Sequence, residues 1–211
     1  MNLDLSLRSL LSSSTLPASE ARALMAHVLD KYYQLPRSAL LSRDDMTLSL
    51  EANLAWEDLQ SKRMAGEPIA YLIGKRGFHN IELFIAPGVL IPRPETELLV
   101  EIGLREIQRL ETEITSANVL DLGTGSGAIA LAIAHESSSV MVSATDQSSE
   151  ALAIAATNAK LLGLESRVQF AQGSWYEALG DQTLFDLILS NPPYIANQDI
   201  HLTQGDLRFE P

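Results

Sequence analysis

The chain has 211 residues, of which 46% are hydrophobic and 20% charged, proportions typical of a globular protein with mass for one large domain or two smaller ones. It contains no cysteine, which excludes a disulfide framework, a thiolate metal site and a cysteine nucleophile. Neither a signal-peptide pattern nor an apolar run long enough to span a bilayer is present, so we expect a cytoplasmic protein without a membrane segment.

The net charge of −12 is unevenly distributed along the chain. Residues 1–92 hold nine Lys and Arg against ten Asp and Glu, whereas residues 93–211 hold six against seventeen. Nucleic-acid affinity rests largely on cations that neutralise phosphates, so this acidic half is not expected to bind nucleic acid directly. A small molecule or a basic protein surface is a better-matched ligand.

Residues 1 to about 64 have the pattern of a small helical bundle. One helix is predicted over 17–30, with Ser19 as a candidate N-cap, and a second over 47–64. Their apolar residues recur at helical spacing, and no cluster of catalytic residue types stands among them. Packing is therefore the simplest role for most residues of this segment.

The composition changes at Gly66, where glycine and proline begin to punctuate the chain. Two short strands, at 77–85 and 89–91, are predicted around a turn at Pro87-Gly88, and together form a β-hairpin linker. The run Pro-Arg-Pro-Glu-Thr-Glu at 92–97 follows. Its proline and acidic residues suit the first turn of an amphipathic helix that extends to Leu110.

The strongest fold signal is an alternation of apolar strands with helices. The strands are predicted at 118–122, 140–145, 168–171 and 185–190, and the helices at 128–134 and 149–162. Such alternation predicts a parallel sheet with right-handed crossovers. The second part of the chain is thus an α/β domain of the nucleotide-binding type.

A glycine loop joins the first of these strands to its helix and consists of Gly123, Thr124, Gly125, Ser126 and Gly127. Glycines let the backbone approach a ligand closely, and the amides of the following helix are available to an anion. Asp146 ends the second strand and could accept both hydroxyls of a ribose. A nicotinamide dinucleotide and S-adenosylmethionine both present such a ribose, so the loop and Asp146 leave the cofactor open.

Two further residues bear on the cofactor. Asp121 precedes the loop, and its carboxylate suits the cationic aminoacyl end of S-adenosylmethionine and disfavours a pyrophosphate. The alternative is a structural carboxylate that accepts hydrogen bonds from the loop amides. Trp175 follows the third strand and is a candidate cover for an adenine face, with core packing as the alternative.

The stretch Asn191-Pro192-Pro193-Tyr194 ends the last predicted strand. Its prolines lack N–H donors, so Asn191 should stand at the carboxyl end of the strand, where open α/β sheets bind ligands. The Asn191 side-chain oxygen and the Pro192 carbonyl could each accept one hydrogen of an NH2 group and hold its nitrogen about 3 Å from a transferable methyl, while Tyr194 packs on the planar group. A strand-ending turn without chemistry is the alternative.

Five stretches together carry a family resemblance. Residues 191–194 and 121–127 resemble the class I amino-methyltransferases, which include adenine-N6 DNA methyltransferases. Three further stretches closely resemble the HemK-type protein-(glutamine-N5) methyltransferases that modify peptide chain release factors, namely 66–74, 91–97 and 201–211. The similarity runs from Gly66 to Pro211 and is weaker in the helical segment.

The resemblance implies a class I S-adenosylmethionine-dependent methyltransferase with a Rossmann-like, mainly parallel sheet. It implies a helical substrate-recognition domain at 1–75, a β-hairpin linker at 76–92 and a methyltransferase domain at 93–211. The methyl acceptor would be N5 of the glutamine in the Gly-Gly-Gln motif of release factors 1 and 2, without nucleic acid, membrane or metal. Family members continue past Pro211, so the carboxyl-terminal strands of the sheet are expected to be missing.

The resemblance also implies roles for single residues. Residues 123–127 would bind the amino-acid end of S-adenosylmethionine, Asp146 its ribose and Trp175 its adenine surroundings. Asn191, Pro192 and Tyr194 would be catalytic. Together with Pro193 they would hold the glutamine amide, and Asn191 would also lie near the cofactor. Arg93 and Glu95 belong to a family motif beside the pocket, without an assigned role.

Two other functions stay open. Nucleic-acid adenine methylation shares the Asn-Pro-Pro-Tyr stretch but conflicts with the acidic half of the chain. A non-catalytic remnant that still binds cofactor or release factor would suit a sheet without its closing strands, which would expose an edge.

Overall fold

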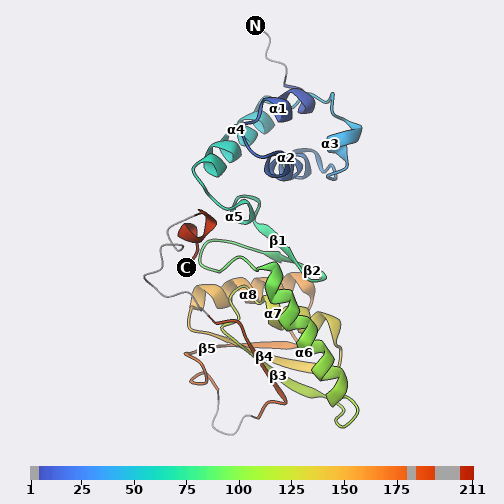
Figure 1. Cartoon of the computed structure of the whole chain (residues 1–211), viewed down its shortest axis with the longest axis vertical. Coiled ribbons are helices and arrows are strands. Elements are labelled where there is room, and N and C mark those ends of the chain that lie inside the picture. Colours follow the sequence, from blue (N-terminus) through green and yellow to red (C-terminus); the bar gives the residue numbers. More distant parts are fainter. Residues whose placement is uncertain (1–4, 180–183, 193–204) are drawn as a thin grey trace. The chain divides into compact units, whose positions relative to one another are not determined.

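The computed structural model describes residues 5–179, 184–192 and 205–211. The chain divides into two compact units, residues 1–73 and 74–211. Figure 1 shows both units and labels most of their helices and strands. The hairpin that the sequence suggested as a linker is part of the second unit.

The first unit is helical. Its elements are α1 (Leu7–Ser13), α2 (Ala18–Tyr33), α3 (Ala39–Ser42), α4 (Leu50–Met64) and α5 (Ile69–Ile73). The prediction of Ser19 as an N-cap is wrong. Pro17 occupies that position, and its carbonyl accepts the N–H groups of Glu20 and Ala21. The helix therefore begins one residue before Ser19, which lies in its first turn.

The predicted apolar periodicity forms the core of the first unit. Leu24, Met25 and Leu29 of α2 pack with Ala52 and Trp56 of α4, and all five are at most 1% exposed. Because the residues of one helical face recur every three to four positions, the sequence pattern alone locates this core.

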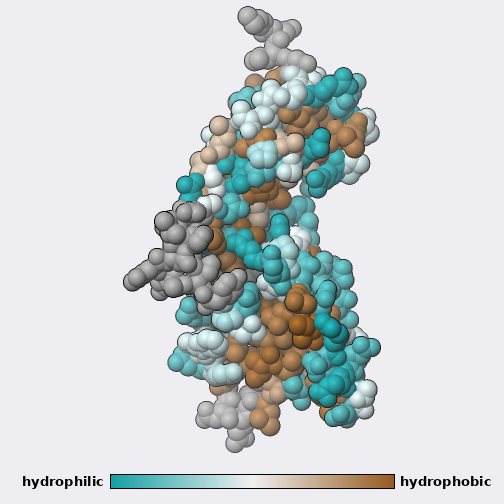
Figure 2. Space-filling view, viewed as in Figure 1, coloured by the Kyte–Doolittle hydropathy of each residue, from teal (hydrophilic) through white to brown (hydrophobic). Residues whose placement is uncertain are grey.

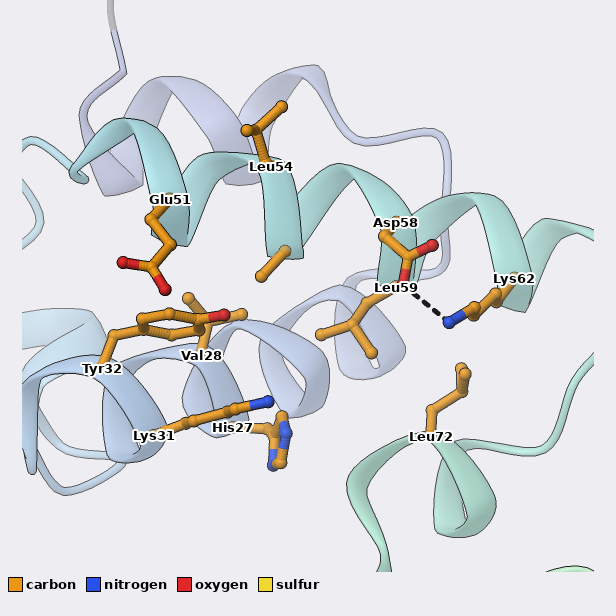
Figure 3. Close-up of a pocket in the computed structure, with 11 residues that line it drawn as sticks. His27, Val28, Lys31, Tyr32, Glu51, Leu54, Asp58, Leu59, Lys62 and Leu72 are labelled. Carbon is orange, nitrogen blue, oxygen red and sulfur yellow. Dashed lines mark ion pairs between the residues drawn. The ribbon is translucent and has the colours of Figure 1, made fainter.

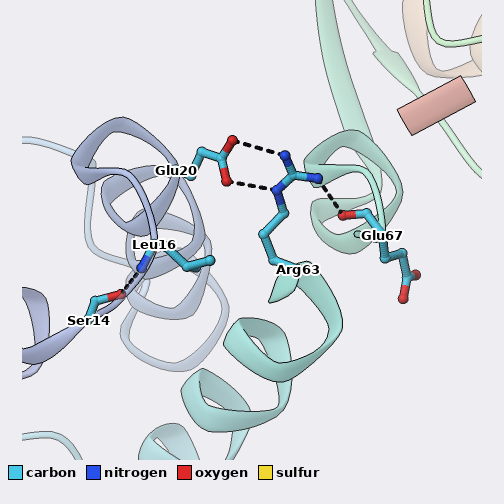
Figure 4. A network of polar contacts seen from close by, with 5 residues as sticks. All are labelled: Ser14, Leu16, Glu20, Arg63 and Glu67. Carbon is cyan, nitrogen blue, oxygen red and sulfur yellow. Dashed lines mark hydrogen bonds and ion pairs between the residues drawn. The ribbon is translucent and has the colours of Figure 1, made fainter. Parts of the chain in front are cut away.

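A network of polar contacts joins the two long helices of this unit. The guanidinium of Arg63 donates to both carboxylate oxygens of Glu20 at 2.7 and 2.9 Å and to the Glu67 carbonyl at 3.2 Å (Figure 4). The hydrogen bond from Arg63 holds the pKa of the Glu20 carboxyl below its ordinary value. Nearby, the Ser14 hydroxyl accepts the Leu16 N–H at 3.3 Å. These contacts connect α2, α4 and the residues that lead to α5.

The second unit begins with an antiparallel hairpin, β1 (Lys75–Phe78) and β2 (Ile81–Phe84). The predicted turn was wrong, because the strands reverse at His79 and Asn80 and residues 89–91 form no strand. His79 has a left-handed φ of 50°. Its N–H donates to Glu97 at 3.1 Å, and the Asn80 carboxamide donates to Glu136 at 2.8 Å. Contacts with distant residues thus stabilise a turn that carries no glycine.

The predicted parallel α/β sheet is confirmed. It consists of β3 (Ala117–Leu122), β4 (Val140–Asp146), β5 (Val168–Gln172) and β6 (Leu187–Ser190), ordered β5-β4-β3-β6 with every neighbouring pair parallel. The helices are α6 (Glu97–Leu110), entered through the 3-10 turn η1 (Pro94–Thr96), then α7 (Ala128–Glu136) and α8 (Ser149–Leu162). A further 3-10 turn, η3, spans Gly205–Phe209.

The three helices lie together on one side of the sheet (Figure 1), with α7 in contact with both α6 and α8. Hydrophobic surface gathers along one side of α6, and its other side is hydrophilic (Figure 2). Leu98 and Ile102 are the large apolar side chains that α6 exposes, at 56% and 44%. In the part of the chain that the structure describes, no helix is both long and apolar enough to cross a membrane.

Candidate active site

Three strand ends of the second unit meet at one edge of the sheet. In the register of the sheet, Leu122 pairs with Thr145 of β4 and with Ser190 of β6. The residues that follow these positions are the start of the glycine loop, Asp146 and Asn191. The Ser190 hydroxyl also donates to the Leu122 carbonyl at 2.9 Å. The parallel sheet thereby brings together three predicted site elements that are distant in sequence.

The glycine loop has a shape that only glycine adopts easily. Gly123, Gly125 and Gly127 have φ values of 73°, 57° and 85°, in the left-handed region that a Cβ disfavours. At the first two glycines a Cβ would meet no atom within 4 Å, whereas at Gly127 it would lie 2.8 Å from Leu131 Cδ1. The loop therefore leaves open space at its first two glycines and packs tightly at its last.

Asp146 connects the end of β4 to this loop. Its two carboxylate oxygens accept the N–H groups of Gly125 and Ser148, each at 2.9 Å. The side chain is partly exposed, and each carboxylate oxygen has a further lone pair. Asp146 can therefore shape the loop and still accept hydroxyl groups of a ligand.

Asp121 is fully buried behind the loop. Its Oδ2 accepts the Thr124 hydroxyl at 2.7 Å and the Ala130 N–H at 3.2 Å. Asp121 is therefore a hydrogen-bonded carboxylate, as the alternative predicted. Its donors, however, are the Thr124 hydroxyl and the Ala130 N–H and not the amides of the loop glycines. Oδ1 has no hydrogen-bond partner among the described residues. Burial raises the pKa of this carboxyl to about 6.

Asn158 on α8 supports the loop and was missed by the sequence reasoning. It is 1% exposed. Its Oδ1 accepts the Phe84 N–H at 2.6 Å, and its Nδ2 donates to the carbonyls of Phe84 and Ser126 at 3.0 and 2.9 Å. One carboxamide thus bridges β2 and the glycine loop. The available signal was an asparagine on the apolar face of α8, next to the buried Ala155 and Ala159.

Asn191 lies at the end of β6, where the sequence placed it. Its Nδ2 donates to the hydroxyl of Thr96 in η1 at 3.2 Å. Thr96 was not among the predicted site residues, although it lies between Arg93 and Glu97 in the family motif. Pro192 is described and exposed. The predicted site residues Pro193 and Tyr194 lie outside the described residues.

Arg93 makes an ion pair with Glu210, with 2.6 Å between Arg93 Nη2 and Glu210 Oε2. The Glu210 side chain is only 1% exposed. Burial raises the pKa of its carboxyl above the ordinary value, against the opposing effect of Arg93. The contact joins the residue before η1 to the residue after η3.

Trp175 follows β5 and has a φ of 51° and an exposure of 58%. The alternative of a core-packing tryptophan is therefore wrong. The ring does not pack in the core. That it covers the adenine of the cofactor stays a prediction.

A separate groove of about 510 Å³ lies in the first unit, between α2 and α4 (Figure 3). None of the predicted site residues lines it. Its rim carries charges of both signs, including an ion pair between Asp58 and Lys62 at 2.7 Å. Within the described ranges, no group of three or more His, Cys, Asp or Glu side chains is arranged for a metal ion.

Comparison with protein families gives two matches. Residues 6–74 match the PrmC N-terminal domain, and residues 101–206 match the methyltransferase small domain. The first match covers the helical unit, and the second covers most of the α/β unit. The prediction of a class I methyltransferase fold behind a helical segment is therefore confirmed.

Several curated proteins named release factor glutamine methyltransferase are similar to the chain. The protein from Bordetella pertussis is 49% identical over 97% of this chain and 72% of its own length. The one from Xylella fastidiosa strain Temecula1 is 51% identical over 91% and 66%, and the one from Aliivibrio fischeri is 44% identical over 95% and 67%.

The chain spans 66–72% of the length of the curated relatives named above. A solved structure, the ribosomal protein L11 methylase from Lactobacillus delbrueckii subsp. bulgaricus, covers 51% of this chain at 29% identity with a TM-score of 0.41. The assignment rests on the sequence relatives and the domain matches, and they place this chain in the release factor glutamine methyltransferase family.

Proposed function

We propose that this chain transfers a methyl group from S-adenosylmethionine to N5 of the glutamine in the Gly-Gly-Gln motif of release factors 1 and 2. The observation that carries the proposal is the meeting of the glycine loop, Asp146 and Asn191 at adjacent strand ends, in a chain 44–51% identical to proteins named release factor glutamine methyltransferase.

The residues at the carboxyl ends of β3 and β4 fit the cofactor. Bound S-adenosylmethionine supplies an electrophilic methyl group on a sulfonium. Gly123 and Gly125 leave the space that a ligand needs to approach the backbone. The free lone pairs of Asp146 can accept the ribose hydroxyls. Asp121, buried in β3 two residues before the loop, disfavours a pyrophosphate and favours a cationic amino group.

The residues after β6 fit a carboxamide acceptor. An amide nitrogen is a poor nucleophile because its lone pair is delocalised, so the site must hold the NH2 group by its hydrogens. The Asn191 oxygen and the Pro192 carbonyl provide two neutral acceptors for them. Orientation of the reacting groups at about 3 Å accounts for a large part of the rate enhancement in such sites. Tyr194 is predicted from the sequence to pack on the planar amide group.

The charge of the chain fits a basic protein partner. The second part of the chain, residues 93–211, has a net charge of −11. Such a surface repels the phosphates of nucleic acid and attracts a basic loop. This is why a release factor, and not DNA, is the proposed acceptor.

The test is methyl transfer from labelled S-adenosylmethionine to purified release factors 1 and 2. We expect label on the wild-type factors and none on a factor whose Gly-Gly-Gln glutamine is changed to alanine. The matched enzyme variant is Asn191→Ala, which should lose transfer because Asn191 holds the acceptor. Calorimetry of this variant measures how much Asn191, which would also lie near the cofactor, contributes to cofactor binding.

Three results would contradict the proposal. Label on DNA adenine in place of release factor would favour the nucleic-acid alternative. Cofactor binding by a folded chain without any transfer would favour the non-catalytic alternative. Label on a release factor that does not depend on the Gly-Gly-Gln glutamine would assign a different acceptor residue.

A further inference from the structure

The Asn158 carboxamide has a single orientation that satisfies its contacts. Its Oδ1 accepts the Phe84 N–H at 2.6 Å, and its Nδ2 donates to the carbonyls of Phe84 and Ser126 at 3.0 and 2.9 Å. A backbone N–H only donates and a backbone carbonyl only accepts. A reversed carboxamide would place its NH2 against an N–H and its oxygen against two carbonyls. Because Asn158 is 1% exposed, solvent does not replace the lost bonds, and the side chain is fixed in one state.

On one side, Asn158 holds the end of the hairpin. Phe84 is the last residue of β2, and both of its backbone polar groups bond to Asn158. At the next position the two ends of the hairpin pair with each other, because the Ile85 N–H donates to the Gly74 carbonyl at 3.0 Å. Leu83 and Ile85, the neighbours of Phe84, are at most 1% exposed. The backbone at Phe84 is thus anchored by the packing of its neighbours and by one carboxamide of α8.

On the other side, Asn158 holds one peptide group of the glycine loop, the group that joins Ser126 to Gly127. The carbonyl of this group accepts from Asn158, and its N–H, that of Gly127, donates to the Thr124 carbonyl at 2.9 Å. Gly125 and Gly127 flank Ser126 with φ values of 57° and 85°, and glycine adopts several backbone conformations at low cost. The two hydrogen bonds therefore set the orientation of this peptide group more than the glycines themselves do.

The loop is fixed from two elements of the second unit. Asp146 holds Gly125 from β4, and Asn158 holds Ser126 from α8. We propose that Asn158 is a positioning residue for the cofactor, which fixes the 126–127 peptide and links the order of the glycine loop to that of the hairpin. The inference rests on the proposed function, which makes the loop the cofactor site. Asn158 is buried and acts through Ser126, whereas the loop contacts the cofactor.

A linkage of this kind works in both directions. If the ordered hairpin strengthens cofactor binding by some factor, bound cofactor stabilises the hairpin contact by the same factor. Cofactor binding should therefore raise the free energy of local opening at Phe84, although Phe84 belongs to the hairpin and not to the loop. Amide hydrogen exchange measures such local opening.

The first experiment measures amide exchange of the wild-type chain with and without S-adenosylhomocysteine, the form of the cofactor that has lost its methyl group. We expect exchange of the Phe84 N–H to slow at least about fivefold, the lower end of typical coupling between sites. The reference is the Thr112 N–H, which donates to the Arg109 carbonyl at 3.3 Å in the exposed turn after α6 and should change less than about twofold. Unchanged exchange at Phe84, or equal slowing at Thr112, would overturn the inference.

The second experiment measures cofactor affinity by calorimetry on folded variants. For Asn158→Ala we expect the dissociation constant of S-adenosylmethionine to rise about fivefold to tenfold, the effect of one lost hydrogen bond. The KM for the release factor at saturating cofactor should stay within about twofold. This split separates a role at the cofactor site from a general loss of activity.

Two controls accompany Asn158→Ala. Ile107→Ala leaves a cavity at a side chain of α6 that is 1% exposed, and so destabilises the same unit without touching the loop. Thr157→Val changes the neighbour of Asn158 on α8, whose hydroxyl donates to the Ala153 carbonyl of its own helix at 2.8 Å. Both variants should bind the cofactor within about twofold of the wild type.

An Asn158→Ala protein that binds the cofactor as tightly as the wild type would overturn the inference and leave the proposed function intact. An equal loss of affinity in Ile107→Ala would also overturn it, because destabilisation alone would then weaken binding. A wild-type chain that binds the cofactor and transfers no methyl group would contradict the proposed function only, since neither measurement of binding needs transfer. If Asn158→Ala does not fold, the exchange of Phe84 in the wild type decides.

Discussion

The two units bury different kinds of side chains. Among the described residues, one polar residue of the helical unit, Asn53, is buried as a whole, and five polar residues of the α/β unit are: Asp121, Thr124, Ser126, Thr145 and Asn158. All five belong to β3, to β4, to the glycine loop between β3 and α7, or to α8. The ion pair between Arg63 and Glu20 in the helical unit is partly exposed, with side-chain exposures of 19% and 24%.

The helical unit buries mainly apolar residues, whereas the α/β unit also buries polar residues next to the candidate site. A buried polar group costs free energy unless it is hydrogen-bonded, so a fold retains one where its position matters. In the second unit, hydrogen bonds of Asp121 with Thr124 and of Asn158 with Ser126 hold the glycine loop. We therefore expect substitutions around the loop to have larger effects than comparable ones in the helical bundle, and four experiments test this.

The largest effect is expected for Gly127→Ala. The new Cβ would lie 2.8 Å from Leu131 Cδ1 and 3.2 Å from Ala155 Cβ, at a φ of 85°. Overpacking and the left-handed backbone together should lower the free energy of unfolding by about 4 kcal/mol. Urea unfolding followed by hydrogen exchange of the second unit measures it.

Gly163→Ala is its control, because this glycine ends α8 at a φ of 68° with no atom within 4 Å of the added Cβ. Only backbone strain remains there, about 1 kcal/mol. Equal decreases in the free energy of unfolding for Gly127→Ala and Gly163→Ala would mean that the loop is not tightly packed at Gly127.

Asn158→Ala should be next, with a loss of about 3 kcal/mol, because it leaves the buried Ser126 carbonyl and the partly buried N–H and carbonyl of Phe84 without this partner. Asn118→Ala, on the exposed side of β3, should change stability by less than about 0.5 kcal/mol. Hydrogen exchange at residues 123–127 should quicken in the first variant only. Unchanged exchange there would show that the bridge from β2 does not hold the loop.

Asp121 should make the second unit less stable as the pH rises. Its folded pKa is about 6, above the ordinary value of 3.8. The folded state therefore binds the proton more tightly, and this stabilisation is complete below pH 3.8 and lost as the pH passes 6. Between pH 4.5 and 7.5 the loss should be about 2 kcal/mol.

The measurement is urea unfolding of the wild type and Asp121→Asn over that pH range. The variant keeps the shape of the side chain without titrating, so the difference in unfolding free energy between the two proteins should change with pH in favour of the variant. A difference that stays constant would place the Asp121 pKa near its ordinary value.

The smallest effect is expected in the helical unit. Arg63→Lys keeps the charge but loses the two-pronged contact with Glu20, at a cost of about 1 kcal/mol. Fluorescence of the buried Trp56, recorded in a Trp175→Phe background, follows the unfolding of this unit alone.

Arg8→Lys provides the control for Arg63→Lys. The Arg8–Asp44 pair is exposed, with side chains 71% and 40% accessible, and should contribute less than about 0.5 kcal/mol. If Arg63→Lys lowered the free energy of unfolding as much as Gly127→Ala, the expected difference between the two units would be wrong.

Sequence alone determined the elements whose signals are local. Apolar periodicity located the bundle core, strand and helix alternation predicted the parallel sheet, and the motifs indicated the family. These succeed because the spacing of residues in a helix or strand decides which side chains share a face. The glycine loop was also visible, since glycine is the residue that a left-handed backbone requires.

Only the tertiary structure decided the contacts between distant residues. The hairpin turn at His79 is stabilised by Glu97, and the loop is supported by Asn158. Asn191 meets Thr96 across 95 positions of sequence. No local pattern encodes such pairs, because each depends on the sheet register and the packing of α6 and α8. The sequence therefore indicated Asn191 as a candidate site residue, and the fold showed that Thr96 contacts it.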